Sequence, residues 1–172
     1  AMYTEPEFFN MMSFQAIEGD PVAALQDGSS AVITERAAKR LFGNESPVGK
    51  TFVYDNSHVL KVAAVLQDVP ANSSIQFDIA IPFRIFEAEN PWLNKWDDNR
   101  IQTWAQLVPS ASIAALNKKL TRLLQTKSDD GSVSLFVYPF KDMRLYGNFS
   151  NGKPNGGKIY MVGLLAILGL FV

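Results

Sequence analysis

The stretch "SAVITERAAKRLFGNESPVGKTFVY", residues 30–54, holds the most clearly patterned unit of the chain. Its short apolar run at residues 31–33 predicts a strand, and Thr34 is a residue type that caps helix N-termini. The residues after Thr34 predict a helix that ends at Gly43, because glycine readily adopts the left-handed conformation of a helix C-terminus. The side chains predicted to face inward from this helix are those of Ala37, Ala38, Leu41 and Phe42.

Beyond Lys50 the hydrophobic period changes to two, which is typical of strands. "TFVYDNSHVLKVAAVLQDV" predicts a hairpin with strands at 51–54 and 59–67 and a turn at Asp55, Asn56 and Ser57. In "IQFDIAIPF", residues 75–83, one predicted strand face carries positions 75, 77, 79 and 81, and the other carries Gln76, Asp78 and Ala80. Two further strands are predicted at 101–108, "IQTWAQLV", and at 133–139, "VSLFVYP".

Helix signals lie between these strands. Pro6 and the pair Asp20–Pro21 mark the starts of two short helices, of which the first turns Phe8, Phe9 and Met12 inward and the second runs through Leu25. A short helix is expected at 85–89, and Ser110 or Ser112 can cap a later amphipathic one. That helix carries Ile113, Leu116, Leu120, Leu123 and Leu124. Strands and helices alternate irregularly and the hairpins are antiparallel, so the predicted class is α+β.

The composition of the chain excludes several classes of function. The 172 residues are 47% hydrophobic with a net charge of −1 and a pI near 5.8, which favours a folded chain and gives no field that attracts nucleic acid. Scattered cations such as Arg36, Lys39 and Arg40 are interpreted as the solvated face of a helix. The chain has no cysteine, which excludes disulfides, zinc–cysteine sites, iron–sulfur clusters and a thiol nucleophile.

"GNESPVGKT", residues 43–51, is similar to a phosphate-binding loop but departs from it in three ways. Five residues rather than four separate Gly43 from the Gly49–Lys50 pair. A helix precedes the segment and a strand follows it, whereas phosphate binding needs the reverse order. Pro47 also removes one backbone donor. The segment is therefore interpreted as a helix-to-strand connection.

No other pattern indicates catalysis. The single histidine, His58, is interpreted as a solvated turn residue, because a catalytic role needs an orienting partner. The acidic turns at 97–99 and 129–131 lack the spacing of a calcium loop. We therefore expect no catalytic residue, no metal and no cofactor.

Three phrases together resemble a known family: residues 8–25, residues 30–54 and "VLKVAAVLQDVPANSSIQFDIAIPF" at 59–83. In that order they resemble the extracytoplasmic domain of MacB-like ABC transporter permeases, whose membrane part is FtsX-like. The family-motif residues of the second phrase are Thr34, Glu35, Ala38, Leu41, Phe42, Gly43, Pro47, Gly49 and Lys50. Those of the third phrase are Asp68, Pro70, Asn72, Ser73, Phe77 and Asp78.

The resemblance implies a domain of two lobes, one with porter-like βαβ elements and one an inserted lobe of strands and helices. It implies the MacB-like domain at residues 1–150, lacking the family's first membrane helix and the start of the porter-like lobe. A flexible linker follows at 151–158, and the beginning of a transmembrane helix at 159–172. It places the domain on the periplasmic side of the inner membrane.

The same resemblance implies a mechanical function. A cytoplasmic ABC ATPase would hydrolyse ATP, a second permease copy, identical or different, would complete the dimer, and family members can recruit a periplasmic adaptor or outer-membrane component. The domain would couple ATP-driven movement of membrane helices to export or extraction of a substrate. One alternative is an extracytoplasmic module that senses a peptide or lipid, and another is a hydrolase with a carboxylate pair that the sequence does not reveal.

The last segment, "IYMVGLLAILGLFV" at 159–172, contains no charge and no proline. A helix of this length measures about 21 Å, against a bilayer core of roughly 30 Å. A buried final helix of a soluble domain is the alternative, but such helices normally carry a polar stripe and this segment is apolar all round. Lys158 with Tyr160 resembles an interfacial anchor. We expect it to be poorly ordered in isolation or covered by another copy.

Overall fold

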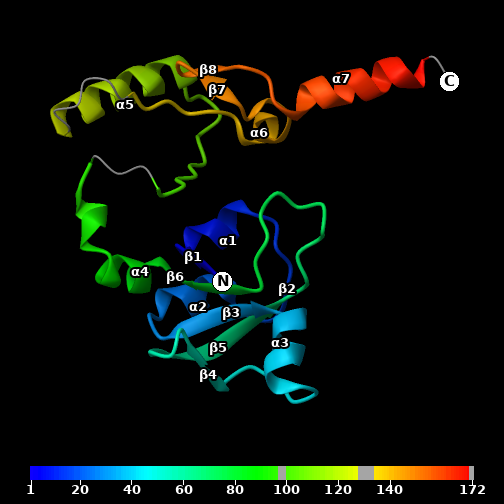
Figure 1. Ribbon diagram of the computed structural model, residues 1–172. Helices are drawn as coiled ribbons and strands as arrows, with labels where there is room; N and C mark the ends of the chain where they lie inside the picture. The colour runs from blue at the N-terminus through cyan, green and yellow to red at the C-terminus, as the bar shows by residue number, and fades with distance from the viewer. Residues whose placement is uncertain (97–99, 128–133, 171–172) are drawn as a thin grey trace. The chain divides into compact units, whose positions relative to one another are not determined.

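The computed structural model (Figure 1) describes residues 1–96, 100–127 and 134–170. The chain forms two compact units. Unit 1 consists of residues 1–94 and 102–106, and unit 2 of residues 95–101 and 107–172. Helices and strands are mixed within one chain, which confirms the predicted α+β class.

Unit 1 is built on a mixed six-stranded sheet in the order β1-β6-β3-β5-β2, with β4 paired to β5 beside β2. Strand β5 is the longest, and it pairs in parallel with β3 and antiparallel with β4 and β2. Strand β3 also pairs antiparallel with β6, which pairs in parallel with β1. The strands are β1 (Met2–Thr4), β2 (Ala16–Gly19), β3 (Ser30–Thr34), β4 (Thr51–Tyr54), β5 (His58–Leu66) and β6 (Ile79–Pro82).

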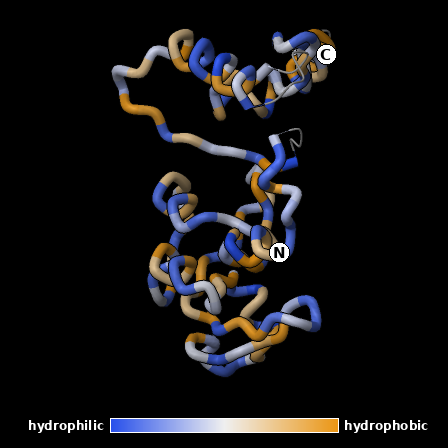
Figure 2. The backbone as a smooth tube through the Cα atoms, turned by 90° about the vertical axis from the view of Figure 1, so that its left-hand side faces the viewer, coloured by the Kyte–Doolittle hydropathy of each residue, from blue (hydrophilic) through white to orange (hydrophobic). Residues whose placement is uncertain are grey.

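Helices cover both faces of this sheet. Val32 and Ile33 are adjacent on β3 and fully buried, yet they enter different core clusters because neighbouring strand side chains point to opposite faces. Val32 packs in the cluster that includes residues of α1 and α2, and Ile33 packs with residues of α3. The helices are α1 (Glu7–Met11), α2 (Pro21–Gln26), α3 (Glu35–Phe42), α4 (Phe83–Glu89) and the 3₁₀ turn η1 (Pro91–Asn94). Hydrophobic and hydrophilic stretches are interleaved along this unit (Figure 2).

Most local predictions for unit 1 are confirmed. Asp20 caps α2 by accepting hydrogen bonds from the backbone N–H groups of Val22 and Ala23. The β4–β5 hairpin turns where predicted, with Asp55 and Asn56 at positive φ. On α3, Ala37 and Ala38 are buried and Phe42 packs against their cluster.

Two predictions for unit 1 are wrong. Leu41 was expected inside, but its side chain is 41% exposed. Helix α3 packs on the sheet through Ala37 and Ala38, and in its last turn Phe42 packs against the same cluster while Leu41 points away from it. The strand expected from residue 75 begins at Ile79, and Ala80, assigned to its polar face, is fully buried. Ala80 packs in the cluster that includes residues of α1 and α2, whereas Ile79 packs against the cluster that includes residues of α3, so both faces of β6 are covered.

The predictions of strands at 101–108 and 133–139 are also wrong, as far as these residues are described. Residues 101–108 and 134–139 carry no strand hydrogen-bond ladder, and alternation alone cannot make a strand without a neighbour. Instead, the backbone N–H of Val137 donates to the Asn117 side chain at 2.8 Å.

Unit 2 contains α5 (Ile113–Lys127), α6 (Phe140–Tyr146), the β7 (Phe149–Ser150) and β8 (Lys153–Pro154) hairpin, and α7 (Lys158–Gly169). Ser112 caps α5 by accepting from the N–H of Ala115. Leu124 is the one buried apolar residue among the described residues of this unit, so the apolar face predicted for α5 is largely uncovered.

The segment expected as a linker, 151–158, holds the turn of this hairpin, strand β8, three glycines at positive φ and the first residue of α7. Its flexibility stays a prediction. Helix α7 has no buried residue. Within the described residues, no helix combines the length and apolar character that crossing a membrane requires.

Candidate functional site

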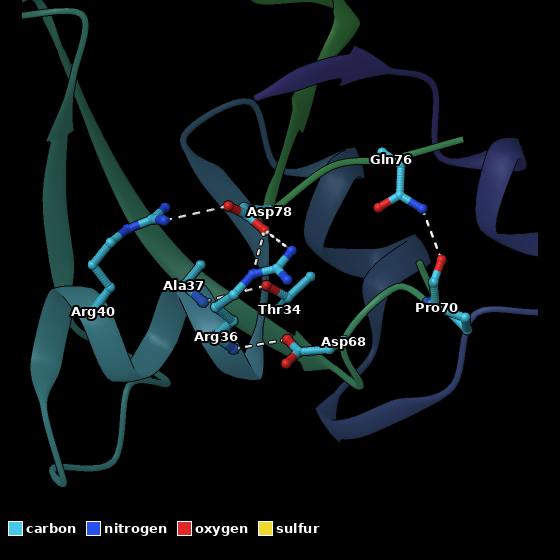
Figure 3. A network of polar contacts seen from close by, with 8 residues as sticks. All are labelled: Thr34, Arg36, Ala37, Arg40, Asp68, Pro70, Gln76 and Asp78. Carbon is cyan, nitrogen blue, oxygen red and sulfur yellow. Dashed lines mark hydrogen bonds and ion pairs between the residues drawn. The ribbon is translucent and has the colours of Figure 1, made fainter. Parts of the chain in front are cut away.

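Three polar residues of the motif, Thr34, Asp68 and Asp78, lie close to the first turns of α3 (Figure 3). Thr34 ends β3 and caps α3, and its fully buried hydroxyl accepts a hydrogen bond from the N–H of Ala37 at 3.3 Å. The N–H of Thr34 donates to the carbonyl of Asp78 at 2.9 Å. One residue therefore joins the strand, the helix and the start of β6.

Asp68 supplies a second cap from a distant part of the chain. Its Oδ1 accepts from the backbone N–H of Arg36 at 2.8 Å. This N–H belongs to the first turn of α3, where backbone donors lack helical partners and the helix dipole favours negative charge. The contact fixes the end of β5 to α3.

Asp78 binds the side of the same helix. Its Oδ1 accepts from Arg36 Nε at 3.2 Å and Nη2 at 2.6 Å, and its Oδ2 pairs with Arg40 Nη1 at 3.3 Å. The two arginines are four residues apart, so they project from one face of the helix. Hydrogen bonds from Arg36, followed by its charge and by Arg40, hold the pKa of Asp78 below its ordinary value.

Between the two aspartates, residues 69–77 form a loop closed on itself. The Gln76 amide donates to the carbonyls of Pro70 at 2.7 Å and Ser73 at 3.1 Å, and the N–H of Ser73 also donates to Pro70. We call Thr34, Arg36, Arg40, Asp68 and Asp78 the α3 clamp. The clamp holds both ends of the loop on one helix.

The other motif residues form the C-terminal connection of α3. Gly43 has φ 64° and donates to the Lys39 carbonyl, as expected for a helix stop. The N–H groups of Gly49 and Lys50 donate to the carbonyls of Val62 and Pro47. Because these donors are occupied, they are not available to a phosphate. This geometry agrees with the interpretation as a helix-to-strand connection.

Lys50 is held in the same connection. Its Nζ forms an ion pair with Glu45 and lies 5.6 Å from the centroid of the Phe42 ring. Glu35 is exposed in the first turn of α3, where its negative charge interacts favourably with the positive end of the helix dipole. The structure thus divides the predicted residues into two groups, one at each end of α3.

Sequence reasoning missed the clamp roles of Arg36 and Arg40, which were interpreted as solvated. Their side chains are 54% and 58% exposed, so they face solvent and still pair with Asp78. Their i, i+4 spacing was the available signal, but no local pattern indicates a carboxylate partner about 40 residues away.

His58 is likewise not a solvated turn residue. It begins β5, and its Nε2 lies 2.7 Å from Glu89 Oε1 on α4, with the His58 side chain 25% exposed. The pair borders an open hollow of about 420 Å³ that Ser29, Ser57 and Arg84 also line. The Arg84 guanidinium donates to the Gln26 carbonyl.

The arrangement is built to hold elements together. Within the described residues, no group of three His, Cys, Asp or Glu side chains could hold a metal ion. This statement does not cover the acidic turns at 97–99 and 129–131, because both lie outside the described residues. The clamp residues engage one another and the backbone, which is the arrangement of a structural joint.

Replacing Asp78 with asparagine is expected to lower the free energy of unfolding by about 1 kcal/mol at neutral pH, because the partly exposed pair is screened by solvent. The pKa of Asp78 is lower in the folded state than in the unfolded state. Its contribution is therefore complete above about pH 4 and is lost as pH falls through the folded value. Urea denaturation at several pH values measures this difference.

The exposed carboxylate of Glu18 on β2 gives a charge-matched control. Glu18→Gln should change stability by less than about 0.5 kcal/mol at either pH. A loss in Asp78→Asn that persists undiminished in acid would contradict the ion-pair explanation.

The chain is similar in sequence to one protein family and in fold to several solved structures. The family model of the MacB-like periplasmic core domain matches residues 1–123. A comparison with curated protein sequences gave no match. Among solved structures, a domain of a permease protein from Porphyromonas gingivalis is 24% identical with a TM-score of 0.62, over 93% of this chain and 69% of that one.

Two further structures are more distant. The periplasmic region of MacB from Actinobacillus actinomycetemcomitans is 21% identical with a TM-score of 0.44, over 71% of this chain and 53% of that one. The extracellular domain of the noncanonic ABC-type transporter YknZ from Gram-positive bacteria is 19% identical with a TM-score of 0.45, over 71% and 60%. The family match covers both ends of α3 and the clamp, and the chain belongs to the family of MacB-like periplasmic core domains.

Proposed function

We propose that this chain is the non-catalytic extracytoplasmic domain of an ABC transporter permease. In this role it couples ATP-driven movement of membrane helices to export or extraction of a substrate. The observation that carries the proposal is the family match over residues 1–123. The α3 clamp supports it, because the motif residues engage structural partners instead of forming a reaction centre.

A mechanical role needs elements that move together. In unit 1 the clamp ties the end of β3, the end of β5 and the start of β6 to one helix. A displacement applied to any of these strands would then be passed to the whole sheet, since packed and hydrogen-bonded elements move as rigid bodies.

Helix α7 supports attachment to a membrane. Residues 159–170 carry no charge, and their exposed apolar side chains include Leu165 at 63% and Leu170 at 85%. Exposed apolar surface of this extent is unfavourable in water. We propose that α7 is the beginning of a transmembrane helix that enters the inner membrane from the periplasmic side.

The proposal requires an ATPase as a separate domain or subunit, together with a second permease copy. Affinity purification of the full-length protein from its native membrane should recover an ABC ATPase in fixed proportion, with ATP hydrolysis in the purified complex. A variant without residues 1–158 should still recover the ATPase, because that contact lies on the cytoplasmic side. Recovery of the protein with neither an ATPase subunit nor an ATPase domain would overturn the proposal.

The sensor alternative has one observation in its favour, the hollow beside His58 and Arg84, whose polar side chains could meet a charged peptide or lipid. It predicts that peptides or lipids raise the melting temperature of the isolated chain, and that Arg84→Gln abolishes this rise. The permease proposal predicts no saturable effect at this hollow.

A further inference from the structure

Charge is unevenly divided along the chain. Residues 134–170 carry four cations, Lys141, Arg144, Lys153 and Lys158, against one anion, Asp142, whereas the complete chain has a net charge of −1. All four cations are exposed. A patch of this sign attracts anionic surfaces.

The same segment presents exposed aromatic and apolar side chains. Phe149 in β7 packs against Phe136 at 5.4 Å and against Tyr138 at 4.8 Å between ring centroids, yet Phe136 and Phe149 remain 39% and 38% exposed. On α6, Phe140, Met143 and Tyr146 recur every three residues and are 47%, 40% and 39% exposed. We call these six residues the aromatic surface of unit 2.

Backbone contacts connect this surface to α7. The N–H of Asn155 donates to the Asn148 carbonyl at 2.7 Å, and Asn148 donates to the Gly156 carbonyl at 3.4 Å. Gly157 lies so close to the Leu145 carbonyl that a Cβ there would overlap it. The hairpin, the end of α6 and the start of α7 are therefore joined as one structure.

We propose that the aromatic surface of unit 2 and its four cations lie on a lipid membrane, at the level of anionic headgroups, beside the point where α7 enters. Three of the five tyrosines in the chain lie between residues 138 and 160. Tyrosine is enriched at membrane interfaces, where its ring is apolar and its hydroxyl remains hydrated. Lysine and arginine add attraction to anionic lipids.

Two arguments favour a membrane over a second copy of this surface. Two such surfaces would each bring an excess of positive charge, which opposes a symmetric contact. The surface is also continuous with α7, whose apolar side chains require a lipid or protein environment.

This inference rests on the proposed function, which places the start of α7 outside the cytoplasm. Cations are usually favoured on the cytoplasmic flank of a membrane helix, so four on the opposite flank call for a separate role.

Because the chain has no cysteine, single nitroxide labels can measure depth in a bilayer. The labelled variants are Met143→Cys and Phe149→Cys on the surface, Leu165→Cys on α7, and Val59→Cys as a control on β5 in unit 1, which is 63% exposed. Accessibility to oxygen and to a water-soluble nickel chelate is compared in vesicles with phosphatidylglycerol and in vesicles of phosphatidylcholine alone.

In vesicles with phosphatidylglycerol, labels 143 and 149 should lie at headgroup depth, label 165 deeper and label 59 in water. In phosphatidylcholine alone, labels 143 and 149 should shift towards water. If label 165 is in the bilayer while labels 143 and 149 are as accessible as label 59, the inference fails and the attachment by α7 stands. If label 165 is also in water, the proposed membrane attachment fails too. Equal depth of labels 143 and 149 in both lipids would overturn the assignment to anionic headgroups.

Charge removal provides a second measurement on the same chain. Lys153→Gln is expected to weaken binding to phosphatidylglycerol vesicles by about 5-fold, since each cation near an anionic surface contributes a factor of this size. Lys39→Gln on α3 removes an exposed cation from unit 1 and should leave binding unchanged. Equal effects of the two substitutions would contradict a local role for unit 2.

Discussion

Replacing Leu165 with aspartate is expected to lower the partitioning of the chain into lipid bilayers by about 100-fold or more. Leu165 lies within α7 and is 63% exposed, so the substitution leaves the described packing intact. Near the centre of a membrane helix leucine is favoured and aspartate is disfavoured by roughly 3 kcal/mol or more in total, and each 1.4 kcal/mol is about tenfold. Vesicle flotation at increasing lipid concentration measures the change.

Val53 on β4 provides a matched control, because it is apolar and also 63% exposed. Val53→Asp introduces the same charge in unit 1 and should change partitioning by less than about 2-fold, since it removes no membrane contact. If both substitutions reduce partitioning equally, α7 is not the element that enters the bilayer.

Replacing Thr34 with valine is expected to lower the free energy of unfolding by about 2 kcal/mol. Valine keeps the shape of the fully buried side chain but removes the hydroxyl that accepts from the N–H of Ala37. A lost N-cap costs roughly 0.5–2 kcal/mol, and a buried donor without its acceptor costs a similar amount. Chemical denaturation of the two chains gives the difference directly.

Thr34→Ser separates the hydroxyl from the methyl group. Serine retains the cap and loses only one buried methyl, so we expect a loss of about 1 kcal/mol, smaller than that of valine. A serine variant less stable than the valine variant would show that packing, rather than the hydrogen bond, gives this position its importance.

The parts of the fold that sequence predicts well are those with local chemical signals. The Asp20 and Thr34 caps, the stop at Gly43 and the β4–β5 turn each depend on residues within one or two turns of chain. The hydrophobic patterns between these signals then specify strands or helices of nearly the right length. Local chemistry was therefore sufficient for the unit around α3.

The failures share a different cause. Residues 101–108 alternate as a strand should, but a strand forms only when another strand lies beside it, and the sequence does not state which segments meet. Ala80 is buried on the face predicted to be polar, because α1 and α2 pack on that face of the sheet. The pairs of Asp78 with Arg36 and Arg40 and of Glu89 with His58 likewise link distant segments.

The motif residues mainly connect elements of the fold. Residues at the N-terminus of α3 join three strands, and those at its C-terminus return the chain to β4 and β5. This explains how a segment similar to a phosphate-binding loop occurs in a domain of a permease family. Its glycines and lysine are used to close the connection.

The proposed coupling is tested most directly by the distance between two copies of the domain. In the full-length permease, reconstituted with its ATPase in a bilayer, each copy carries one nitroxide in place of Val53, and a second preparation carries it in place of Glu18. Electron paramagnetic resonance then compares the nucleotide-free complex with the complex trapped by ATP and vanadate. The account predicts that the distance distributions at both positions shift on trapping. Unchanged distributions at both positions, in a complex shown to have trapped nucleotide, would contradict it.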